Sequence, residues 1–309
     1  MTEWFSTTAL AVLLALVLDR VLGEPSVWHP LVGFGRWVDF CRARLQMPLS
    51  LSADAQRLGG IIAWSLAVLP WMGVLALLLL ILPPALEWLL SVLVLYFCIG
   101  WQSLRQHAQA IEQPLLAGQL PQAREAVGRI VSRDTDELTA SEVAKAGIES
   151  VLENGSDAIF APLFCFIVLG APGVLLYRLA NTLDAMWGYK SPSLLHFGWC
   201  AARIDDVLNF IPARLVVYTY GACGNWRLAR QCARQQSYRW KSPNAGPVMA
   251  AGAGALGVQL GGAAVYFGQL ETRPVLGKGE APMPVHLTRA IELIDKGVWL
   301  WAALICILI

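Results

Sequence analysis

GGIIAWSLAVLPWMGVLALLLLIL, residues 59–82, is 24 positions long and contains no charged side chain. A helix needs about 20 apolar residues to cross the hydrocarbon core of a bilayer, so this stretch is long enough to span a membrane. Pro83-Pro84 ends it, and residues 86–101 form a second apolar run whose single charge is Glu87. The sequence therefore predicts a transmembrane hairpin with a very short connection.

The composition of the whole chain agrees with a membrane protein. Of its 309 residues 56% are hydrophobic, against about 45–50% in soluble domains. The net charge of +1 gives no electrostatic basis for binding nucleic acid. The seven cysteines form no CxxC pair and the four histidines do not pair at metal-ligand spacing, so we expect neither a disulfide framework nor a zinc site.

Four other apolar segments accompany the hairpin: residues 4–18, 158–177, 247–268 and 297–309. The first predicts a short span. The third is either a span or a buried helix, and Gly257 and Gly261 within it have the spacing that allows close helix packing. The last reaches only about 20 Å as a helix. It completes a span if the amphipathic stretch before it contributes, and otherwise is a half-inserted anchor.

The segment 158–177 is interrupted by Gly170-Ala171-Pro172-Gly173. Each half is too short to cross a bilayer, and glycine and proline break helices. We therefore expect a re-entrant hairpin, which returns the polar stretches on its two sides to one face. The alternative is a kinked single span, which would separate those stretches.

Basic residues indicate the orientation. Five arginines lie between residues 20 and 58, whereas the Pro83-Pro84 connection has none. The positive-inside rule places residues 20–58 and 102–157 in the cytoplasm. We expect an all-α, polytopic protein of the bacterial inner membrane, with one membrane-embedded domain over residues 1–309. Its site would face the cytoplasm and be built from the polar loops 19–58, 102–157 and 178–246.

Polar side chains gather directly before residue 158: Arg133, Asp134, Asp136, Glu149, Glu153, Asn154 and Asp157. Carboxylates beside such an apolar run are costly unless they are paired, hydrated or bound to metal. Thr139 and Glu142 fit a capping box, so we expect a helix from there to about Glu153. Glu142 favours an ordinary solvated helix face. Glu149 and Glu153 favour a functional role, because magnesium typically takes one or two carboxylates together with phosphates.

Two more clusters follow residues 158–177. Asn181 and Asp184 repeat the spacing of Asn154 and Asp157 on the other side of the proposed hairpin, and Tyr189 and Lys190 lie just beyond. The next cluster is Arg203, Asp205, Asp206 and Asn209, with Arg214 after it. Adjacent aspartates repel each other and favour a shared cation. An intrahelical ion pair between Arg203 and Asp206 is the alternative.

Two loops offer cations for binding anions. Residues 241–246 contain Lys241, Asn244 and turn residues whose backbone N–H groups could cradle an anion, although an ordinary turn explains them equally. Near the N-terminus, His29 and Arg36 belong to a tight basic loop. The chain contains neither a P-loop nor a Rossmann glycine motif.

Several of these stretches belong to longer blocks: residues 18–20, 23–25, 29–30, 132–136, 149–154, 157, 161–164, 177–178, 181–186, 188–189, 197–199, 202–206, 209, 211–215 and 242–246. In these blocks the chain resembles the membrane-bound adenosylcobinamide-phosphate synthases of cobalamin biosynthesis, the CobD/CbiB family, over almost its whole length. One departure follows Gly246, where Pro247-Val248 replaces the family's aromatic residue and proline.

The resemblance implies an ATP- and magnesium-dependent amide ligation. Adenosylcobyric acid, a corrinoid, is joined to (R)-1-aminopropan-2-ol O-phosphate or a related amino-alcohol phosphate. It is also compatible with oligomers and with other late cobalamin-pathway membrane enzymes as partners, besides membrane lipid.

Chemistry assigns roles to individual residues. Magnesium-ATP would be bound by Asp134, Asp136, Glu153, Asn154, Asp157, Asn181, Asp184, Asp205 and Asp206. Catalysis would also involve Arg133, Arg203 and Arg214 at phosphate and Glu149 as acceptor of the amine's proton. Substrate would contact His29, Arg36, Tyr189, Lys190, Lys241 and Asn244.

Three other functions remain open. A magnesium-diphosphate transferase of the prenyltransferase type would also use paired Asn/Asp-x-x-Asp sites. A non-catalytic membrane sensor could keep the scaffold. A transporter is disfavoured because charges are scarce within the spans.

Overall fold

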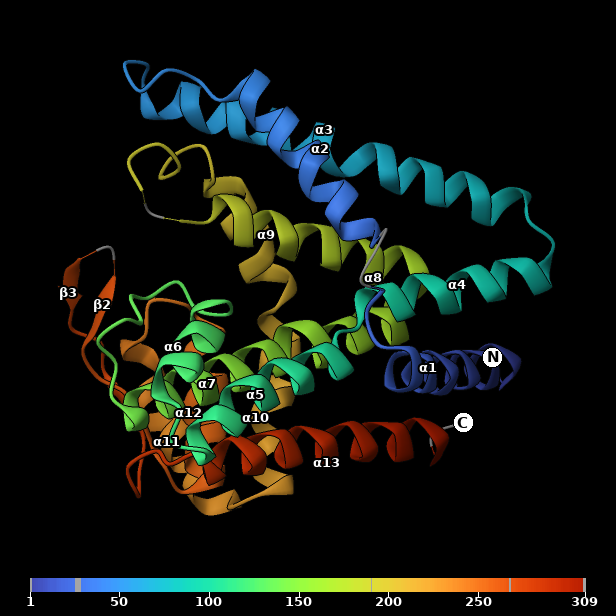
Figure 1. Cartoon of the computed structure of the whole chain (residues 1–309). Helices are drawn as coiled ribbons and strands as arrows, with labels where there is room; N and C mark the ends of the chain where they lie inside the picture. Colours follow the sequence, from blue (N-terminus) through green and yellow to red (C-terminus); the bar gives the residue numbers. More distant parts are fainter. Residues whose placement is uncertain (1, 26–28, 190, 267, 308–309) are drawn as a thin grey trace. The chain divides into compact units, whose positions relative to one another are not determined.

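The computed structural model describes residues 2–25, 29–189, 191–266 and 268–307 (Figure 1). The first eight helices are α1 (Thr2–Leu22), α2 (Pro30–Leu45), α3 (Ala53–Ile81), α4 (Pro84–Cys98), α5 (Trp101–Leu116), α6 (Leu120–Gly128), α7 (Ala140–Gly155) and α8 (Ala161–Trp187). A π-helical turn, Ser156–Phe160, joins α7 to α8. The remaining elements are α9 (Trp199–Leu208), α10 (Phe210–Cys223), α11 (Trp226–Gln236), a 3₁₀ turn (Ser237–Arg239), α12 (Ala245–Leu256), β1 (Gln259–Gly261), β2 (Ala264–Tyr266), β3 (Gln269–Glu271), β4 (Val275–Gly277) and α13 (Val285–Ile307).

The chain divides into two compact units, where the sequence predicted one domain. The first unit comprises residues 1–100 and 161–209, and the second comprises residues 101–160 and 210–308. Each unit has its own helical core, and each is described by itself below.

Among the residues that the structure describes, three helical segments are long and apolar enough to cross a membrane: Ala53–Ile81, Pro84–Leu116 and Ala140–Trp187. The predicted hairpin is confirmed. Helix α3 ends at Ile81, Leu82 is extended, and Pro84 occupies the first turn of α4, where its missing N–H costs nothing. The second segment is interrupted, because Ile99 is extended between α4 and α5. These features are consistent with an all-α polytopic membrane protein.

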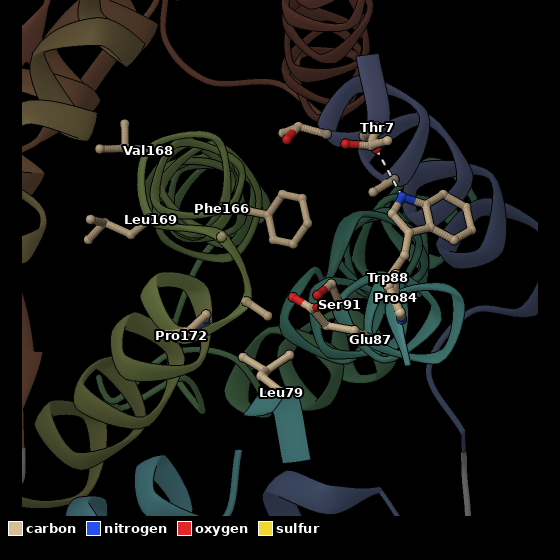
Figure 2. Close-up of a pocket in the computed structure, with 14 residues that line it drawn as sticks. Thr7, Leu79, Pro84, Glu87, Trp88, Ser91, Phe166, Val168, Leu169 and Pro172 are labelled. Atoms are coloured by element: carbon tan, nitrogen blue, oxygen red, sulfur yellow. Dashed lines mark hydrogen bonds between the residues drawn. The ribbon is translucent and has the colours of Figure 1, made fainter. Parts of the chain in front are cut away.

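Helix α8 breaks where the sequence predicted. Gly170 has φ 65° and ψ −157°, a conformation outside the helical region that glycine adopts without steric cost. A Cβ placed on Gly173 would lie 2.7 Å from the carbonyl oxygen of Cys165, eight residues earlier. In a straight helix these two residues would be about 12 Å apart along the axis. The chain therefore folds back sharply at Gly170, and Figure 2 shows Phe166 and Pro172 on two arms that run in different directions.

The core of the first unit joins α2, α3, the second arm of α8 and α9. Phe34, Ala63 and Leu183 are among its buried members. The backbones approach closely at Gly60 of α3, where an added Cβ would lie 2.0 Å from the carbonyl oxygen of Phe197. Glycine at this position therefore lets α3 pack directly against the segment before α9.

The second unit is held together by α12, most of whose residues are buried. A Cβ on Gly254 would lie 2.7 Å from the carbonyl oxygen of Leu228 in α11, and a Cβ on Gly252 would lie 2.6 Å from the side chain of Leu152 in α7. Small residues thus bring α12 against two neighbouring helices.

The structure corrects the interpretation of residues 247–268. Only the part up to Leu256 is helical, and it is buried in the second unit. Gly257 (φ 70°) ends α12 in the left-handed conformation, and Gly261 (φ 71°) lies in β1, so this pair does not form a helix-packing motif. Strand β1 pairs antiparallel with β4, and β2 pairs antiparallel with β3. The sequence analysis did not predict these two small sheets.

Helix α13 settles how the last apolar run is used. It begins at Val285 and continues to Ile307, so the amphipathic stretch before residue 297 does contribute to one 23-residue helix. That stretch carries Arg289, Glu292, Asp295 and Lys296. The helix is not one of the three segments that are apolar enough to span a membrane.

Candidate functional site

The capping box at the start of α7 is confirmed. Thr139 Oγ1 accepts from the backbone N–H of Glu142, and Glu142 Oε2 accepts from the backbone N–H of Thr139 at 2.9 Å. Glu142 therefore has a structural role at the helix terminus. The cap fixes where α7 begins, and so it fixes the face on which Glu149 lies two turns later.

Glu149 lies at the centre of a buried ion-pair triad in the second unit. Its Oε2 accepts a very short hydrogen bond from Arg133 and a 3.3 Å bond from Arg273, and its Oε1 accepts from the backbone N–H of Gly261 at 2.7 Å. The three side chains are almost fully buried, with exposed fractions of 4% for Glu149, 6% for Arg133 and 9% for Arg273.

Arg273 is fixed by further contacts. Its Nε donates to the carbonyl of Gly262 at 3.1 Å, and its NH1 donates to the hydroxyl of Tyr266 at 3.2 Å. The guanidinium lies 5.2 Å from the ring centroid of Trp240, within the range of a cation–π interaction. Arg273 thus reaches α7 from the loop between β3 and β4.

A cavity of ≈ 270 Å³ opens beside the triad. Glu153, Trp240 and Tyr266 contribute to its wall together with the triad. The carboxylate of Glu149 already accepts hydrogen bonds from two guanidiniums and one backbone N–H. The arrangement therefore favours Glu149 as the anchor of two guanidiniums over the general-base role that the sequence suggested.

The other acidic residues near α7 have separate surroundings. The carboxylate of Asp134 accepts from the backbone N–H of Gly268 at 2.7 Å, which ties the β2–β3 hairpin to this loop. Asp136 is exposed. Asn154 is also exposed and donates to the carbonyl of Ser150 at 2.9 Å. Asp157 lies in the π-helical turn, a feature that often occurs at functional sites.

A second polar cluster lies in the first unit, centred on Asp205 of α9. Asn181 of α8 donates to Asp205 Oδ1 at 3.2 Å, and Asn209 donates to Asp205 Oδ2 at 3.0 Å. Tyr177 in turn donates to the side-chain oxygen of Asn209 at 2.8 Å. Burial raises the pKa of the Asp205 carboxyl above its ordinary value, against the opposing effect of the two amide donors.

Two neighbouring acidic residues of the first unit, Asp206 and Asp184, contact groups within a few residues of themselves in the chain. Arg203 and Asp206 form an i,i+3 ion pair at 3.2 Å, as the alternative interpretation predicted. A Cβ on Gly188 would lie 2.1 Å from Asp184 Oδ1, so the carboxylate of Asp184 packs against the end of α8.

The predicted substrate-binding residues of the first unit do not form a cluster with one another. His29 caps α2, its Nδ1 accepting from the N–H of Leu31 at 3.2 Å, and burial lowers the pKa of its imidazole. Arg36 and Tyr189 are exposed, and Lys190 lies outside the described residues.

In the second unit, Arg214 fixes the loop before α12. It donates to the side-chain oxygen of Asn244 at 2.5 Å and to the carbonyl of Pro243 at 3.1 Å. The backbone N–H groups of Asn244 and Ala245 donate to Ser242 Oγ, which is the ordinary-turn alternative. Lys241 pairs with Glu271 of β3 at 2.5 Å.

The predicted magnesium ligands are divided between the two units. Within the described residues, no three His, Cys, Asp or Glu side chains are arranged to hold a metal ion. Magnesium is usually bound by one or two carboxylates together with substrate phosphates, so an arrangement without a preformed cage still fits a nucleotide-bound ion. In the second unit Asp157 lies in the π-helical turn after α7, where its carboxylate could serve such an ion.

A further cavity, of ≈ 610 Å³, lies at the break in α8 in the first unit (Figure 2). Glu87, Phe166 and Pro172 are among its lining residues, and Trp88 Nε1 donates to the carbonyl of Thr7 at 3.0 Å. None of the predicted site residues lines it.

Comparison with known proteins identifies the family. The family model described as "CobD/Cbib protein" matches residues 12–294. The cobalamin biosynthesis protein CobD of Chromobacterium violaceum is 55% identical over 300 residues, covering 96% of this chain and 95% of that protein. CobD of Stutzerimonas stutzeri is also 55% identical, covering 94% and 95%, and CbiB of Salmonella typhimurium is 37% identical, covering 93% and 92%. The chain belongs to the CobD/CbiB family. No solved structure matches it.

Membership of the CobD/CbiB family supports a role in cobalamin biosynthesis and confirms the resemblance found in the sequence. The structure adds three residues that the sequence analysis missed: Arg273, Tyr266 and Trp240. Tyr266 lies in β2, within residues 247–268, which were interpreted from the sequence as an apolar segment. Arg273 lies in the loop between β3 and β4, for which nothing was predicted. No spacing in the sequence pointed to the contact of Arg273 with Glu149, or to the contacts of Tyr266 and Trp240 with Arg273.

Proposed function

We propose that this CobD/CbiB-family protein is an ATP- and magnesium-dependent carboxylate–amine ligase of cobalamin biosynthesis. It would join a propionate carboxylate of adenosylcobyric acid to the amine of (R)-1-aminopropan-2-ol O-phosphate or a related amino-alcohol phosphate. The observation that carries the proposal is the family match over residues 12–294, with relatives up to 55% identical over nearly the full chain.

The chemistry requires activation of the carboxylate. A carboxylate is a poor acyl donor, because its charge repels a nucleophile and oxide is a poor leaving group. Phosphorylation by ATP gives an acyl phosphate with a good leaving group, and bound magnesium would neutralise phosphate charge during the transfer. The protein's own groups would then bind and orient the substrates, exclude water and accept the proton that the amine loses as the amide forms.

The residues of the second unit suit phosphate handling. Arg133 and Arg273 present two guanidiniums that Glu149 holds in fixed orientation, and guanidiniums match phosphate geometry. Glu153 lines the same cavity. Asp157 lies one turn beyond Glu153 and is a candidate ligand of magnesium. We expect this site at the cytoplasmic face, where ATP is available.

The direct test is an assay with purified protein, adenosylcobyric acid, 1-aminopropan-2-ol O-phosphate and magnesium-ATP. Mass spectrometry should detect the amide, and the nucleotide product should distinguish ADP from AMP. Samples without ATP, or with EDTA, should yield no amide. Failure to form an amide with any amino-alcohol phosphate would rule out the ligase assignment.

The role of the first unit in binding magnesium can be tested separately. Asp184→Asn and Asp205→Asn should lower turnover most at limiting magnesium, if these carboxylates share a cation with the nucleotide. Asp54→Asn is the matched control, because Asp54 is 90% exposed and pairs with Arg57 one turn later in α3. Wild-type turnover by both variants at limiting magnesium would refute the shared-cation hypothesis.

One observation favours a second candidate. An almost wholly apolar cavity of ≈ 410 Å³ lies in the first unit, with Leu78, Phe97 and Leu179 among its lining residues. Such a cavity suits the hydrocarbon chain that a magnesium-diphosphate prenyltransferase must hold. Product analysis after incubation with a prenyl diphosphate would distinguish the two activities.

A further inference from the structure

The cavity beside Glu149 has two guanidiniums in its wall. Arg133 and Arg273 share the carboxylate of Glu149. All three side chains are more than nine-tenths buried, so solvent screens their charges poorly. An anion in the adjoining cavity would therefore interact strongly with the two guanidiniums.

A donor in the same wall also lacks an acceptor. Arg133 Nε is buried and has no hydrogen-bond partner among the described residues. Buried donors are almost always satisfied, and one left unmade costs stability. Arg133 lines the cavity, so an oxyanion bound there can accept from this guanidinium.

The size of the cavity limits the anion. At ≈ 270 Å³ it falls below the range of about 300–1,000 Å³ that is typical of pockets for drug-sized ligands. A phosphate group with a substituent of a few carbon atoms fits this space, whereas a whole nucleoside triphosphate would not be enclosed.

The opposite charge is also present on the wall. Glu153 lines the cavity one helical turn after Glu149, where residues four apart share a face. The cavity therefore presents two guanidiniums together with a second carboxylate. This pattern matches a small molecule that carries both a phosphate and an ammonium group.

We propose that this cavity binds the amino-alcohol phosphate, with Arg133 and Arg273 at the phosphate and Glu153 at the ammonium. This inference rests on the proposed function and deepens it, because it locates one substrate and names the residues that select it. Glu149 acts as a positioning residue by holding both guanidiniums.

The β2–β3 hairpin forms one side of the site. Tyr266 lies at the end of β2 and Arg273 follows β3. The contacts that hold this hairpin in place include two with Asp134, whose carboxylate accepts from the backbone N–H of Gly268 and whose N–H donates to the carbonyl of Val265. Lys241 also pairs with Glu271 of β3. The hairpin thus delivers Arg273 to a cavity whose other residues come mainly from α7 and the loop before it.

The test is isothermal titration calorimetry on the full-length protein in detergent, without corrinoid or magnesium. The titrants are 1-aminopropan-2-ol O-phosphate, inorganic phosphate, 1-aminopropan-2-ol and ATP. The phosphomonoester should bind, inorganic phosphate should compete with it, and the unphosphorylated amino alcohol should bind at least tenfold more weakly. ATP should not displace the phosphomonoester, because the cavity does not enclose a nucleotide.

Three variants locate the binding. Arg273→Met should weaken binding of the phosphomonoester by about tenfold or more, since a charge-assisted hydrogen bond is lost. Arg129→Met, which changes the exposed arginine directly after α6 in the same unit, should bind as wild type. Arg273→Lys keeps the positive charge and provides the test if Arg273→Met does not fold. It should bind the phosphomonoester several-fold more weakly than wild type, because the planar guanidinium is lost.

Glu153→Gln provides a readout that a general loss of structure would not give. It should weaken binding of the amino-alcohol phosphate and leave binding of inorganic phosphate unchanged. Equal affinities for wild type, Arg273→Lys and Glu153→Gln would overturn the proposal, as would a wild-type protein that binds no phosphate.

The outcomes separate this inference from the ligase assignment. If amide forms and the KM for the amino-alcohol phosphate is unchanged in Arg273→Lys, the cavity is wrong and the function stands. If the binding results are as expected and no amide forms, the cavity stands and the function is wrong.

Discussion

Glu149→Gln tests the buried triad most directly. Glutamine has nearly the shape of glutamate, and its side-chain oxygen can still accept from the backbone N–H of Gly261. The substitution removes the negative charge that faces Arg133 and Arg273. Both guanidiniums then remain in a region where their side chains are only 6% and 9% exposed.

The expected loss of stability follows from this burial. Removing one partner of a buried ion pair costs about 3–5 kcal/mol, because the remaining charge is desolvated without compensation. Here two cations lose their shared partner, so we expect a loss at the upper end of that range. In a chain of this size the melting temperature should fall by roughly 5–10 °C.

The assay is thermal unfolding in detergent, followed by intrinsic fluorescence, with size-exclusion chromatography to confirm that the variant is folded at the start. Glu125→Gln is the matched control. Glu125 also pairs with an arginine, but both side chains are 69% exposed and in an i,i+4 arrangement. This pair should contribute about 0.3–0.5 kcal/mol. If Glu149→Gln and Glu125→Gln unfold at the same temperature, the triad does not have the energetic role assigned to it.

Three further predictions concern the fold. Gly60→Ala should destabilise the protein by about 1–3 kcal/mol, because the new Cβ would lie 2.0 Å from the carbonyl oxygen of Phe197. Gly73→Ala is the control on the same helix and should not change stability, because nothing lies within 4 Å of its new Cβ. Comparable unfolding midpoints for the two variants would contradict the close approach. Thr139→Ala should lower the free energy of unfolding by about 1 kcal/mol, since it removes the helix cap, and an unchanged midpoint would argue against the cap. Burial raises the pKa of Asp205 in the folded state, so folding favours its protonated form. Stability is therefore lost as the pH rises through that raised pKa. Unfolding measured at increasing pH from about pH 4 should show the wild type losing stability relative to Asp205→Asn, and a constant difference between the two would refute the shift.

Much of the helical framework could be predicted from local signals. Pro83-Pro84 separates α3 from α4 because proline lacks the N–H that the next helical hydrogen bond would need. Thr139 and Glu142, three positions apart, form the capping box that marks the start of α7. Gly170 marks the reversal in α8 because its backbone is left-handed. In each case the physical cause lies within a few residues of the feature.

The triad could not be predicted in this way. Arg133, Glu149 and Arg273 are far apart in the sequence, and Arg273 reaches Glu149 only because β1 pairs with β4 and β2 with β3. These strands are three residues long each, too short to show an alternating pattern. The acidic residues beside α7 did indicate where the site would be, but not which arginines would accompany them.

The chain of hydrogen bonds around Asp205 runs in one direction. Tyr177 donates to Asn209, and Asn209 donates to Asp205, so every donor in this sequence of bonds points toward the carboxylate. If Asp205 takes up a proton at Oδ2 on the side that faces Asn209, that oxygen becomes a donor toward Asn209, whose amide must turn over to accept from it. The turned amide then offers an N–H to the Tyr177 oxygen, and the tyrosine hydroxyl must rotate to find another acceptor. Protonation of Asp205 on α9 would therefore change the orientation of the Tyr177 hydroxyl on α8, through the side chain of Asn209.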